Sequence, residues 1–227
     1  MPEHYKDQDA NAIFALDIGT RSVIGVLGKA ENGRFHVLGL EKEEHTHRAM
    51  MDGQIEDIGQ VAAVARVVMQ RLEERAKLHL KRVCVAAAGR ALKSERASFA
   101  LEFQAPKKID EEMVAQLEAG AVSMAEQAIS ELPDQTYNGL YMVGYTVSQY
   151  RLNGYPMSTL IGHSGKRIEA DVVATFLPRE VVESLYSVVA RLGLEVSSLK
   201  LEPIAALNAA IPPELRLLYL VLVDLGA

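Results

Sequence analysis

Residues 13–27 read IFALDIGTRSVIGVL, and the polar break at their centre decides the fold prediction. The apolar run 13–16 predicts a buried strand, and 23–29 predicts a second strand after a short loop. After the first strand, Asp17 is followed by a glycine and two residues with hydroxyl side chains. Such a pattern, taken by itself, is more often a structural turn than a binding site. The chain nearly repeats this pattern in LLYLVLVDLGA at 217–227, and two such strand ends together favour a binding site.

The side chains in these two loops suit a phosphate group with its metal ion. Gly19 permits close approach of the backbone, and consecutive backbone N–H groups beside Thr20 and Ser22 can form an anion-binding nest. Asp17 would repel a phosphate directly, but a carboxylate can act through a hydrated Mg²⁺, which keeps several of its waters. In the second loop, the stretch Asp224–Gly226 would supply the opposing carboxylate and glycine.

Composition excludes several classes of protein. The 227 residues carry a net charge of −6, which gives no electrostatic support for a role in binding nucleic acid. The single cysteine, Cys84, rules out a disulfide within the chain and fits a reducing, cytoplasmic setting. The polar N-terminus lacks the apolar region of a signal peptide. No stretch approaches the ~20 apolar residues that a membrane helix needs.

The order of expected elements predicts an α/β fold. A hairpin signal at Asn32-Gly33, a helix with Asp57 as its N-cap and a returning strand in RVCVAAAG predict a β-β-β-α-β order at the start. Further along, Asp110 is suited to cap a long helix over 111–131, and strands surround a second Asn-Gly turn. A helix, a strand, a short helix over 203–210 and a last strand over 217–225 end the chain.

We therefore expect one α/β unit that is interrupted by a smaller one. Residues 13–105 and 178–227 would form a unit with a mixed five-stranded sheet and flanking helices. Residues 106–177 would form a small α+β unit inserted between them, and residues 1–12 would be a disordered leader.

Four segments resemble the actin-like ATPase superfamily, which has a ribonuclease H-like fold and includes actin, heat-shock chaperone ATPases and sugar kinases. LDIGTRSVIGVLG at 16–28 resembles its first phosphate loop, and VLVDLGA at 221–227 resembles the start of the second. LEPIAALNAA at 201–210 resembles the segment that connects the two loops. YPMSTLIGHSGKRIEADVVATFLP at 155–178 resembles the exit from the subdomain that is inserted in FtsA-like and PilM-like members and that sugar kinases lack. The resemblance covers 13–227.

The resemblance implies a nucleotide site. Asp17 and Glu202 would be the catalytic carboxylates, with Glu202 helping to orient the attacking water, and Asp17 and Asp224 would hold Mg²⁺ through water. The residues implied to line the two phosphate loops are Gly19, Thr20, Arg21, Ser22, Asp224 and Gly226. FtsA-like loops usually have a small residue and a lysine where this chain has Arg21-Ser22. A phosphate contact and a solvent position therefore both stay open for Arg21.

The resemblance also implies a function. It points to an ATP-binding scaffold of bacterial cell division that self-associates or recruits protein partners in response to nucleotide, with at most slow ATP hydrolysis. Such a protein is cytoplasmic, and peripheral at the inner face of the membrane in its full-length form. A chaperone-type or reactivating ATPase of the same fold stays open, and a small-molecule kinase is less favoured because no acidic base for a sugar is evident. Because the second loop stops at Ala227, we expect an N-terminal fragment that is inactive alone.

Three further stretches have plainer interpretations. EKEEHTHR at 41–48 puts His45 and His47 on one face of a strand end, where solvated charge is favoured and a metal site stays conceivable. GHSGKR at 162–167 lacks the spacing of a Walker P-loop, so we interpret it as a turn between strands. RALKSERASFALEF at 90–103 is typical of an edge strand, which can pair with another copy.

Overall fold

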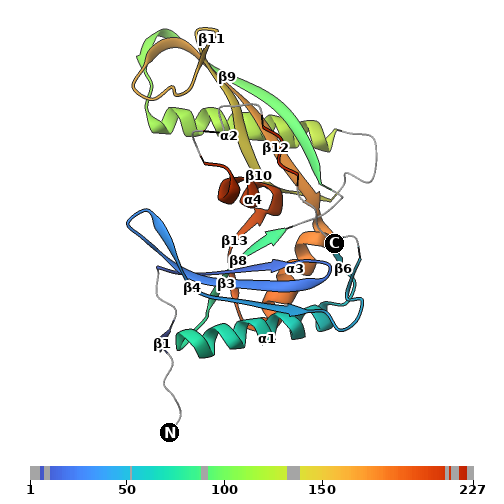
Figure 1. Ribbon diagram of the computed structural model, residues 1–227. Coiled ribbons are helices and arrows are strands. Elements are labelled where there is room, and N and C mark those ends of the chain that lie inside the picture. The colour runs from blue at the N-terminus through green and yellow to red at the C-terminus, as the bar shows by residue number, and fades with distance from the viewer. Residues whose placement is uncertain are drawn as a thin grey trace. The chain divides into compact units, whose positions relative to one another are not determined.

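A computed structural model describes residues 6–7, 11–51, 53–87, 92–131, 139–212, 215 and 220–223 (Figure 1). Its contacts divide the chain into two compact units. The first unit comprises Met1–Arg90 with Glu180–Ala227, and the second comprises Ala91–Arg179.

The first unit is built on a mixed sheet of five strands in the order β13-β8-β2-β3-β4. The antiparallel part consists of β2 (Ala12–Ile18), β3 (Ser22–Glu31) and β4 (Arg34–Glu44). The parallel part adds β8 (Arg82–Ala87) beside β2 and β13 (Glu195–Leu201) beside β8. Asn32 and Gly33 have φ values of 51° and 72°, as a two-residue hairpin turn requires. The predicted α/β class and five-stranded mixed sheet are confirmed.

One face of this sheet is covered by α1 (Ile58–Ala76) and α3 (Arg179–Leu192). Alternate residues of β2, among them Phe14 and Leu16, are buried on this face because side chains of a strand alternate between its two sides. The guanidinium of Arg66 on α1 donates a hydrogen bond to the carbonyl of Arg191 on α3. The predicted N-cap of α1 is confirmed, since the side chain of Asp57 accepts the Gln60 N–H at 2.9 Å.

The remaining elements of the first unit are short. The helix α4 (Glu202–Ala210) follows β13 directly, and β5 (Met50–Met51) pairs with β6 (Gln54–Ile55). In the segment that the sequence assigns to a disordered leader, β1 (Lys6–Asp7) lies parallel to β7 (Leu78–His79).

The second unit is a four-stranded antiparallel sheet with one helix against it. Its strands, in the order β11-β10-β12-β9, are β11 (Tyr155–Met157), β10 (Leu140–Leu152), β12 (Ser164–Pro178) and β9 (Lys93–Lys108). The helix α2 (Glu111–Ser130) begins where Asp110 accepts the Met113 N–H at 2.9 Å, as predicted. Met113 and Leu117 of α2 share a core with Ile168 of β12.

Two expectations from the sequence differ from the structure. The boundary after Ala105 falls inside β9, which pairs with β12 from Lys93 to Lys108, so these contacts assign its residues to the second unit. The predicted edge position of this strand is confirmed. The expected last strand is described only over 220–223, which form no strand and are exposed. A strand needs a neighbour for its backbone hydrogen bonds, and no described strand pairs with these four residues.

No helix in the described ranges is both long enough and apolar enough to cross a membrane.

Candidate functional site

The parallel strands of the first unit bring their carboxyl ends to one edge of the sheet. In the register, Asp17 on β2 lies beside Ala86 on β8, and Ala86 lies beside Lys200 on β13. Two strand spacings separate Asp17 from Lys200, which is roughly 10 Å. Glu202 follows Lys200 by two residues as the first residue of α4. The sheet thus brings Asp17 and Glu202, which are 185 positions apart in the sequence, to the same edge.

The residues after Asp17 form a tight turn between β2 and β3. The Gly19 N–H donates to the Ser22 carbonyl at 3.0 Å, and Thr20 and Arg21 form the exposed tip. A Cβ at position 19 would lie 3.2 Å from the Ser22 oxygen, closer than most real Cβ contacts. The short distance across the turn therefore explains the glycine at position 19. Its backbone conformation does not, because its φ is not in the left-handed region.

Arg21 makes an ion pair beside the turn. Its Nε lies 3.4 Å from Oε1 of Glu44, and its side chain is 69% exposed. Lys42 approaches the same carboxylate oxygen at 3.5 Å. The guanidinium therefore lies in solvent beside an acidic partner.

His45 contacts the same turn, and the sequence gives no sign of it. Its ring Nε2 lies 3.1 Å from the Gly19 carbonyl, and its backbone N–H donates to the Arg21 carbonyl at 3.0 Å. The conceivable metal site at His45 and His47 has no support here, because no group of three or more potential metal ligands occurs among the described residues.

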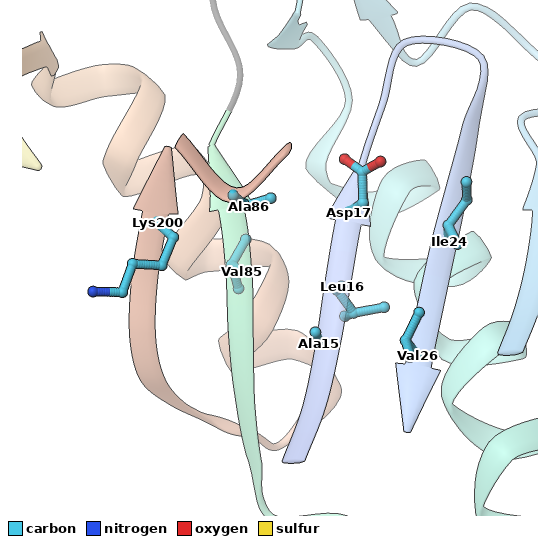
Figure 2. A pocket seen from close by; sticks show the side chains of 9 residues that line it. Ala15, Leu16, Asp17, Ile24, Val26, Val85, Ala86 and Lys200 are labelled. Carbon is cyan, nitrogen blue, oxygen red and sulfur yellow. The ribbon is translucent and has the colours of Figure 1, made fainter. Parts of the chain in front are cut away.

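A shallow apolar cavity of about 170 Å³ adjoins Asp17 on the face of the sheet opposite α1 and α3 (Figure 2). In this view the carboxylate of Asp17 stands at the end of β2, while the ammonium of Lys200 is directed away from it. The residues that line the cavity are Ala15, Leu16, Asp17, Ile24, Val26, Val85, Ala86, Lys200 and Ala205. The sequence prediction missed Lys200, because its place beside Ala86 depends on the pairing of β13 with β8, which EVSSLKL alone does not reveal.

Asp224 and Gly226, the residues implied for the second loop, lie outside the part of the chain that the structure describes. The described part of the site is therefore the turn after β2, the cavity beside it and the start of α4.

Comparison with known proteins finds relatives of one kind by sequence. No family model matches the chain. The cell division protein FtsA of Streptococcus pneumoniae is 24% identical over 213 residues, which are 93% of this chain and 44% of that protein. FtsA of Neisseria meningitidis is 23% identical over 97% of this chain and 50% of its own length. The chain therefore spans about half the length of these curated relatives.

A solved structure resembles this chain in fold. The type IV pilus biogenesis complex of PilM and PilN contains a chain that superposes with a TM-score of 0.55 at 17% identity. The superposition covers 86% of this chain and 49% of the other. These findings confirm the resemblance to the FtsA-like and PilM-like proteins and the actin-like ATPase fold of this chain.

Proposed function

Because the chain resembles FtsA-like and PilM-like proteins and has their fold, we propose that it is the part of a bacterial cell-division scaffold that carries its first phosphate loop. The full-length protein binds ATP with Mg²⁺ and, in response, associates with itself or with protein partners. It hydrolyses ATP slowly at most, and it works in the cytoplasm, at the inner face of the membrane.

One observation supports this proposal above the others. Asp17 and Glu202 lie at the same edge of the sheet, at the carboxyl ends of parallel strands. Ligands of open α/β sheets bind outside these ends. The parallel topology brings the strand ends together, and the two carboxylates at those ends are what favour a ligand there.

The residues at this edge fit a nucleotide with its metal ion. A carboxylate at position 17, next to the hydroxyls of Thr20 and Ser22, is the set of hard oxygen groups that a hydrated Mg²⁺ prefers. Bound Mg²⁺ would neutralise negative charge on the phosphates. The turn would bind phosphate oxygens through backbone N–H groups, and the Glu202 carboxylate would orient a water molecule in line with the terminal phosphate.

Titration of Mg·ATP into the full-length protein, read by calorimetry, tests the proposal with Asp17→Asn beside the wild type. The substitution keeps the shape of the side chain and removes the charge that orders the metal's water. We expect the Mg²⁺-dependent affinity to fall by at least about tenfold, which corresponds to about 1.4 kcal/mol.

Asp57→Asn is the matched control for this titration. It removes a carboxylate from the same unit, and asparagine caps a helix as well as aspartate does. The affinity of the Asp57→Asn protein for Mg·ATP should equal that of the wild type. Equal affinity in the Asp17→Asn protein, or no binding of Mg·ATP by the wild type, would overturn the proposed function.

A further inference from the structure

We propose that His45 is a positioning residue of the Gly19–Ser22 turn, which it holds in the form that presents a backbone N–H group to a phosphate. This rests on the proposed function of the turn as the first phosphate loop. His45 directly follows β4, 26 residues further along the chain than Gly19.

His45 binds the turn at two carbonyl oxygens. Its ring Nε2 lies 3.1 Å from the Gly19 oxygen, and its backbone N–H donates to the Arg21 oxygen at 3.0 Å. A carbonyl oxygen only accepts, so Nε2 carries the proton in this contact. The other ring nitrogen, Nδ1, is buried and has no hydrogen-bond partner among the described residues. The contact with Gly19 is therefore the polar contact that orients the ring.

The planarity of the peptide bond transmits this contact to the next N–H group. In a trans peptide, the carbonyl of Gly19 and the N–H of Thr20 point in opposite directions from one rigid plane. When the imidazole holds the Gly19 carbonyl, it therefore directs the Thr20 N–H away from β4. A donor fixed in this way can bind an anion without first losing conformational freedom.

The neighbouring residue of β4 supports the same arrangement. Glu44, directly before His45, pairs with Arg21 at the tip of the turn. That ion pair is exposed and contributes little by itself. The half-buried ring of His45 is better protected from water, so we assign the positioning role to the ring.

Two variants at this position separate positioning from plain packing. His45→Gln keeps an N–H donor near the place of Nε2, whereas His45→Leu keeps the bulk and removes the donor. His47→Leu is the matched control, because His47 is an exposed histidine two residues further along. Hydrogen exchange of the Gly19 amide, whose N–H donates to the Ser22 carbonyl, reports the turn itself when it is followed in the full-length protein without nucleotide. Calorimetry measures the affinity for Mg·ATP and so reports whether the held turn contributes to nucleotide binding.

We expect His45→Leu to accelerate exchange at the turn and to weaken Mg·ATP binding, each by about tenfold. His45→Gln and His47→Leu should stay within about twofold of the wild type. Unchanged exchange in His45→Leu would overturn the inference, and so would faster exchange with unchanged affinity. If the wild type does not bind Mg·ATP, the proposed function fails, and the exchange rates still decide whether His45 holds the turn.

Discussion

The carboxyl group of Asp171 lies among hydrogen-bond donors on the face of the second unit's sheet that is opposite α2. It accepts from the Arg151 guanidinium at 3.1 Å and from the Ser98 hydroxyl at 2.6 Å. The hydrogen bonds from Arg151 and then Ser98 lower the pKa of Asp171 below its usual value, against the opposing effect of burial. The charged carboxylate is thus favoured more strongly in the folded chain than in the unfolded chain.

This lowered pKa predicts a contribution to stability that depends on pH. A carboxyl group whose pKa is lower in the folded state stabilises the protein above its unfolded pKa, near 4, and loses this contribution as the pH falls through the folded pKa. Asp171→Asn should lower the free energy of unfolding at pH 7 by less than about 1 kcal/mol, because the pair is partly exposed. The difference from the wild type should shrink as the pH falls below the unfolded pKa and disappear once the carboxyl group is protonated in the folded chain as well.

Denaturant unfolding at pH 7 and at low pH measures this difference. Glu102→Gln is the control, since the Glu102 side chain is 70% exposed and its ion pair with Arg167 lies at the surface. A difference between Asp171→Asn and the wild type that is as large in acid as at neutral pH would show that the charge of Asp171 is not its cause.

Single residues also mark the limit of prediction from the sequence. Asp17 was identifiable because its signal is local, a carboxylate and a glycine directly after an apolar strand. The contact of His45 with Gly19 depends on the return of β4 beside β3, and nothing in EKEEHTHR reports which backbone oxygen a histidine will meet. The partner of Arg21 was unpredictable for the same reason.

At the scale of elements, the close packing of α1 against β3 depends on Gly25. A Cβ at this position would lie 2.5 Å from Cγ1 of Val68 and 3.0 Å from Cδ1 of Leu72, both on α1. These two side chains, or the helix that carries them, would have to shift. We expect Gly25→Ala to lower the free energy of unfolding by about 1–3 kcal/mol, the usual cost of overpacking.

The chain offers a matched control in Gly144 of β10. A Cβ there would meet nothing within 4 Å, so Gly144→Ala should change the free energy of unfolding little. Chemical denaturation of both variants gives the comparison. Equal stability of Gly25→Ala and the wild type would mean that α1 adjusts its position without cost.

Elements with local signals were predictable, but an apolar run without a partner strand was not told apart from a true strand. The caps at Asp57 and Asp110 and the turn at Asn32-Gly33 follow from residues that are neighbours in the sequence. The apolar run 217–225 has the composition of a strand, but a strand forms only beside another strand. Its described part, 220–223, has no such partner, and the prediction was wrong for these residues.

At the scale of the whole molecule, the second unit has its own core and neighbouring ends. Lys93, near its start, pairs with Phe176, near its end, in adjacent antiparallel strands. Its core joins Leu117 of α2 to Ile168 of β12, and both side chains are fully buried within the unit. The order of elements predicted an inserted α+β unit, but the sequence pattern put its start after Ala105, which lies inside the long strand β9.

This arrangement predicts that residues 91–179 fold when they are expressed alone. Insertion between two neighbouring ends leaves the backbone pairing of this unit independent of the first unit. We expect a cooperative thermal transition and dispersed amide resonances, as in a small two-state domain. Leu117→Ala is the control for a specific core and should lower the free energy of unfolding by about 2–5 kcal/mol. A broad transition that Leu117→Ala leaves unchanged would mean that the unit acquires its packing only from the rest of the chain.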